Sequence, residues 1–149
     1  MEKIDLIYFK NLGIYSAILG GICAILSLIP IFMPFFSLFF APFLGCLIPL
    51  VLLVVKDGFQ SNETKTYTIL GGISGLCICF SYLIIFSPLA AIIHLINKNY
   101  YDYGIHDLNL FLIALFFVMI ASVYVITNCV TGLIAGGIYI YIKDGKNNG

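Results

Sequence analysis

The stretch that decides the fold is Leu108–Ile142, LNLFLIALFFVMIASVYVITNCVTGLIAGGIYIYI, which is followed by Lys143. Its 35 residues include no Asp, Glu, Lys, Arg or His, so no charge keeps the segment out of a lipid bilayer. A straight helix rises about 1.5 Å per residue, so this stretch would form a helix about 52 Å long. The hydrocarbon core of a bilayer is only about 30 Å thick. The stretch therefore predicts a membrane-crossing helix that is too long for one simple crossing.

The composition of the whole chain argues against a soluble protein. Of its 149 residues, 62% are hydrophobic and 9% are charged, with a mean hydropathy of +1.10. Soluble domains contain about 25% charged residues. All seven basic residues are lysine. The absence of arginine removes the bidentate donor that usually holds phosphates and base edges, so we expect no nucleic-acid partner.

Four polar segments separate three apolar regions, the first of which is long enough for two crossings. These segments are Met1–Asn11, Lys56–Thr66, Asn97–Asp107 and Lys143–Gly149. Because one crossing needs about 20 apolar residues, we expect four spans, at about residues 12–29, 35–55, 67–87 and 108–142. Pro30 and Pro34 mark a turn between the first two spans, since proline removes a helical donor. The expected fold is an all-α membrane protein: one integral membrane domain over residues 1–149, forming an up-down bundle of four transmembrane helices.

The lysines predict how this bundle is oriented. With four spans, both termini and the Lys56–Thr66 segment lie on one side of the membrane, together with six of the seven lysines. The opposite side carries only Lys98. Because basic loops are retained in the cytoplasm, we expect both termini to be cytoplasmic.

The last two predicted spans are overlong on the outer side. If each one crosses over about 20 residues from its cytoplasmic end, the apolar residues 89–96 and 108–121 are left over. Apolar surface of this extent is not stable in water. These segments are expected to tilt, to bend back into the outer leaflet, or to pack as a helical hairpin. We favour a kink at Pro88 that lays the region up to Leu108 along the outer interface.

Small residues recur at intervals of four in three of the predicted spans. The motif Ile-Leu-Gly-Gly-Ile occurs at residues 18–22 and 69–73, and residues 134–138 resemble it. A spacing of four places small side chains on one helix face, where they allow two backbones to approach closely in a membrane. The residues predicted to form such helix-packing faces are Gly13, Ala17, Gly21, Gly71, Gly75, Gly132 and Gly136.

One polar stripe lies within the last apolar run. Tyr124, Asn128 and Thr131 follow helical spacing, and the Asn128 amide is the costliest of them to bury in lipid. One interpretation is a polar lining for a small substrate or a lipid headgroup. The other, which we favour, is an interhelical hydrogen bond to a serine. The candidate partners are Ser16, Ser27, Ser74 and Ser81.

No sequence pattern points to catalysis, a cofactor or a metal. No charged side chain lies deep within a predicted span, whereas proton relays and ion-coupled transporters normally place one there. The five cysteines lie in apolar runs, where a free cysteine packs as a small hydrophobe. His94 and His106 lie near the outer polar segment, but they lack metal-ligand spacing. We therefore expect no enzyme, no cofactor and no metal site. A lipid-active enzyme with a site near the two histidines is the least favoured hypothesis.

These features predict a function in association within a membrane. The chain is expected to be an accessory, assembly or oligomeric membrane subunit that acts through helix–helix packing. Its expected partners are the lipid bilayer and either another membrane protein or a second copy of itself. The alternative is a small transporter or channel subunit whose polar path is lined by Tyr124, Asn128 and Thr131.

Overall fold

The computed structural model describes residues 5–29, 41–96 and 110–147. In order along the chain, its helices are α1 (Leu6–Ser27), α3 (Ala41–Asp57), α4 (Thr64–Ile96) and α5 (Leu110–Asn147). The predicted all-α class is thereby confirmed for the described part of the chain. The predicted turn at Pro30 and Pro34 and the polar segment Asn97–Asp107 lie outside the described residues.

Three of these helices are long and apolar enough to cross a membrane. They are α1, the Thr64–Leu89 part of α4 and the Val118–Gly145 part of α5. The predicted helical membrane character is confirmed at this level. α3 has 17 residues, about 26 Å of helix, which is the lower limit for crossing the hydrocarbon core. The predicted second crossing starts at residue 35, outside the described residues, so the fourth span stays a prediction.

α4 and α5 extend beyond the boundaries predicted for their spans. α4 begins at Thr64 and continues as one helix through Pro88 to Ile96, although the expected span ends at residue 87. A proline within a helix frees one carbonyl, here that of Ile84, and membrane helices tolerate this where local adjustments satisfy the freed group. α5 continues past the predicted end of its span to Asn147. The left-over apolar segments are therefore helical wherever the structure describes them.

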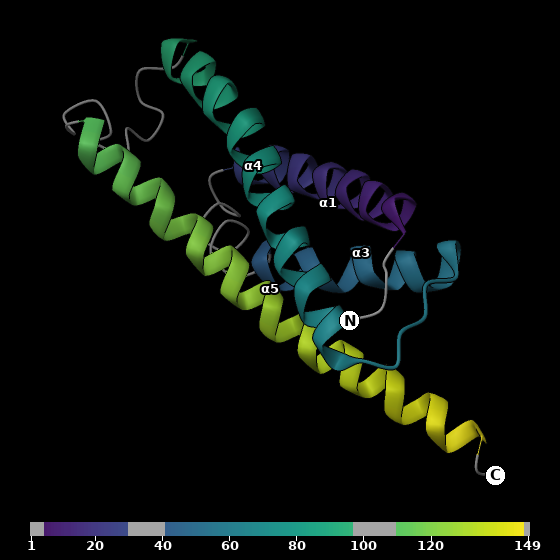
Figure 1. Cartoon of the computed structure of the whole chain (residues 1–149). Coiled ribbons are helices and arrows are strands. Elements are labelled where there is room, and N and C mark those ends of the chain that lie inside the picture. Colours follow the sequence, from purple (N-terminus) through teal and green to yellow (C-terminus); the bar gives the residue numbers. More distant parts are fainter. Residues whose placement is uncertain (1–4, 30–40, 97–109, 148–149) are drawn as a thin grey trace.

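α4 is the central helix of the bundle. It packs most extensively against α5 and next against α1, while α3 makes smaller contacts with all three. α1 and α4 run in the same direction, because Ser16 lies against Ser74 and Gly20 lies against Ile78. α5 runs the opposite way, and Figure 1 shows its carboxyl end projecting beyond the other helices.

The bundle buries several polar side chains beside its apolar core and exposes many large apolar ones, which is unusual for a soluble protein. Hydroxyl and amide side chains are buried between the helices, whereas large apolar side chains are exposed on every described helix. On α1, for example, Ile18 and Ile22 are exposed while Ser16 is fully buried. A soluble protein rarely leaves contiguous apolar surface of this extent uncovered, but a bilayer covers it. The side-chain distribution therefore agrees with the long apolar helices.

The connection between α3 and α4 ties the bundle together at one end. Gly58 has a φ of 69°, the left-handed conformation that commonly ends a helix, and the Phe59 N–H then donates to the Leu53 carbonyl at 3.2 Å. On the other side of the connection, the Lys143 ammonium of α5 donates to Asn62 Oδ1 at 2.8 Å. We call this end of the bundle, which holds residues 58–63 and Lys143, the lysine end.

Candidate functional site

The predicted polar stripe of α5 lies in the contact between α5 and α4. Tyr124, Asn128 and Thr131 are all buried, and Asn128 has none of its surface exposed. The Asn128 side-chain amide donates to the Tyr124 carbonyl at 2.8 Å, and the Thr131 hydroxyl donates to the Thr127 carbonyl at 2.8 Å. On α4, Gly75 faces this stripe so closely that an added Cβ would lie 3.0 Å from the Asn128 Cβ. Tyr124 and Asn128 therefore lie against the backbone of α4 at Gly75, and Thr131 is buried about one turn further along α5.

Two glycines of α5 pack against the first turns of α4. A Cβ at Gly136 would lie 2.7 Å from the Cβ and Cδ2 of Tyr67. A Cβ at Gly132 would collide with the Tyr67 backbone and would lie 3.3 Å from the Gly71 Cα. The Tyr67 side chain is only 2% exposed, and its hydroxyl accepts a hydrogen bond from the Ser61 N–H at 3.2 Å. The structure thus brings Gly71, Gly132 and Gly136 together around a tyrosine that sequence reasoning did not single out.

Tyr67 also belongs to an aromatic cluster that joins three helices. The Phe59 ring lies edge-on to Tyr67 at 5.7 Å and to Tyr8 of α1 at 5.2 Å, measured between ring centroids. Tyr139 of α5 lies 5.8 Å from Tyr67 on the same measure. The position of Tyr67 in the sequence is only a weak indication of this cluster, because a tyrosine just after Lys65 is also typical of the membrane interface.

On α1, the closest approach to α4 is at Gly20, one residue before the predicted Gly21. A Cβ at Gly20 would lie 2.7 Å from the Ile78 carbonyl oxygen, a backbone atom that cannot move aside. At the predicted Gly21, a Cβ would meet only the flexible tip of Ile85 at 2.9 Å. Gly13 has nothing within 4 Å. Gly20 and Gly21 thus both lie against α4, with the closest backbone approach at Gly20, while Gly13 has no neighbour this close.

Serine hydroxyls connect α1 to α4. The Oγ atoms of Ser16 and Ser74 are 2.8 Å apart, and both side chains are fully buried. The Ser81 hydroxyl donates to the Ala17 carbonyl at 2.6 Å, while the predicted packing side chain of Ala17 is itself exposed. Ser27 is buried near the end of α1. Three of the four serines proposed as partners of Asn128 thus form hydrogen bonds between α1 and α4.

A polar contact fastens α1 to the carboxyl end of α3. The Tyr15 hydroxyl lies 3.2 and 3.3 Å from the two carboxylate oxygens of Asp57, to which it donates. The Lys56 ammonium lies 5.4 Å from the centre of the Tyr15 ring, within the range of a cation–π interaction. The helix dipole disfavours a carboxylate at the carboxyl end of a helix. The Tyr15 hydroxyl and the Lys56 ammonium offset this cost. Sequence reasoning missed this contact because its partners are 42 positions apart.

A cluster of thiols and phenols is buried where α1, α4 and α5 meet. Cys23, Cys79, Tyr82 and Tyr124 belong to one buried cluster, in which the cysteines are free. Within the described ranges, no three His, Cys, Asp or Glu side chains gather as they would around a metal ion. The arrangement favours the interpretation of these cysteines as packing residues. His106 and the side chain of His94 lie outside the described part.

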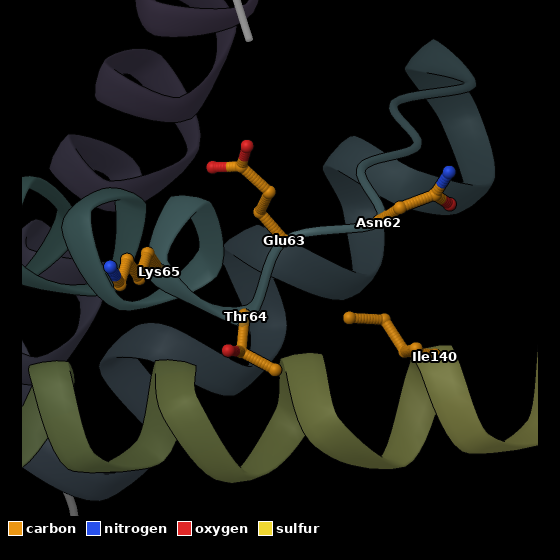
Figure 2. A pocket seen from close by; sticks show the side chains of 5 residues that line it. All are labelled: Asn62, Glu63, Thr64, Lys65 and Ile140. Atoms are coloured by element: carbon orange, nitrogen blue, oxygen red, sulfur yellow. The ribbon is translucent and has the colours of Figure 1, made fainter. Parts of the chain in front are cut away.

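An open hollow of about 600 Å³ lies at the lysine end. It is lined by Asn62, Glu63, Thr64, Lys65 and Ile140. Figure 2 shows the Thr64 side chain directed toward α5, whereas the Glu63 and Lys65 side chains point in other directions. A small-molecule site needs polar groups that converge on the ligand, so the α4–α5 contact is the stronger candidate for function.

Comparison with known proteins gives no relative for this arrangement. The chain matches no family model, no curated protein and no solved structure. Function is therefore inferred from the geometry of the bundle.

Proposed function

We propose that this chain is a four-span integral membrane protein, with both termini in the cytoplasm, that acts by association. It serves as an accessory, assembly or oligomeric subunit whose partners are lipid and either another membrane protein or a second copy. The observation that carries the proposal is the placement of polar groups. Hydroxyl and amide side chains lie in contacts between helices, while the outer surface is apolar and suits lipid or other membrane helices.

The surroundings of the polar stripe favour packing over transport. A path for a solute requires polar groups that face a continuous space. Instead, Asn128 and Thr131 donate to carbonyls of their own helix, and Asn128 lies against Gly75. Buried polar groups of this kind can fix the register of a helix pair. We assign the stripe to the α4–α5 contact and propose no catalytic role for the chain.

Crosslinking in the native membrane, followed by identification of the crosslinked species, tests this proposal. We expect the wild-type chain to give a discrete species that contains either a membrane-protein partner or a second copy. The companion measurement is ion and small-solute flux with the purified protein in liposomes, for the wild type and for Asn128→Leu. Because the Asn128 amide lies in a helix contact, Asn128→Leu should lower the free energy of unfolding. It should leave ion and solute flux the same as in the wild type. A monomer with no partner, together with a flux that Asn128→Leu abolishes, would overturn the proposal in favour of a transporter.

A further inference from the structure

We draw no further inference here: the strongest candidate, the open hollow at the lysine end between the α3–α4 connection and α5, assigns no ligand, because the polar side chains that line it point in different directions and nothing in the structure shows what occupies it.

Discussion

Thr66 carries a buried hydroxyl that has no hydrogen-bond partner among the described residues, and its side chain is 1% exposed. A buried unsatisfied polar group is destabilising, whereas an apolar group of the same shape is not. We expect Thr66→Val to raise the free energy of unfolding by about 1 kcal/mol, seen as a higher thermal midpoint in detergent micelles. The matched control is Thr68→Val, because the Thr68 hydroxyl donates to the Thr64 carbonyl at 3.1 Å and its loss should not stabilise. A lower midpoint for Thr66→Val would show that its hydroxyl has a partner the fold depends on.

At the scale of helices, adjacent glycines of α5 should respond in opposite ways to the same substitution. A Cβ at Gly136 meets the Cβ and ring of Tyr67 within 2.8 Å, whereas a Cβ at Gly137 has nothing within 4 Å. Gly136→Ala should therefore lower the free energy of unfolding by about 1–3 kcal/mol, because the buried Tyr67 cannot move aside. Gly137→Ala should leave it unchanged or raise it by up to about 1 kcal/mol, since alanine favours the helix. Thermal unfolding of both variants checks this, and equal effects would mean that α4 does not lie on Gly136 this closely.

The same contacts show what spacing in a sequence can and cannot predict about helices. Long apolar runs predict the helices themselves, because a charge-free run of this length has no other stable form in a bilayer. Spacing by four predicts one helix face, and Gly132 and Gly136 share the face that meets Tyr67. On α1 several faces carry small residues, and only the crossing with α4 selects Gly20 over Gly13. Contacts such as Tyr15 with Asp57 depend on how distant segments align, which local spacing does not encode.

At the scale of the whole molecule, the hydrogen bond between Lys143 and Asn62 joins the end of α5 to the α3–α4 connection. Two segments in direct contact lie on one side of a membrane, which agrees with an even number of spans between them. Six of the seven lysines belong to this side in the proposed topology, and basic loops are retained in the cytoplasm. The same topology puts Lys98, the seventh lysine, on the opposite side.

This arrangement predicts the labelling pattern of cysteines placed at the lysine end. Gln60 and Gly145 are both exposed there, so Gln60→Cys and Gly145→Cys should each react with a membrane-impermeant maleimide in inside-out vesicles and stay unlabelled in intact cells. The wild-type chain gives the background from its own cysteines, which lie in apolar runs. Labelling of both variants in intact cells would indicate the reverse orientation, with the two segments still on one side of the membrane. Labelling of the two variants from opposite sides would contradict the contact between Asn62 and Lys143, and with it the packing of the bundle at this end.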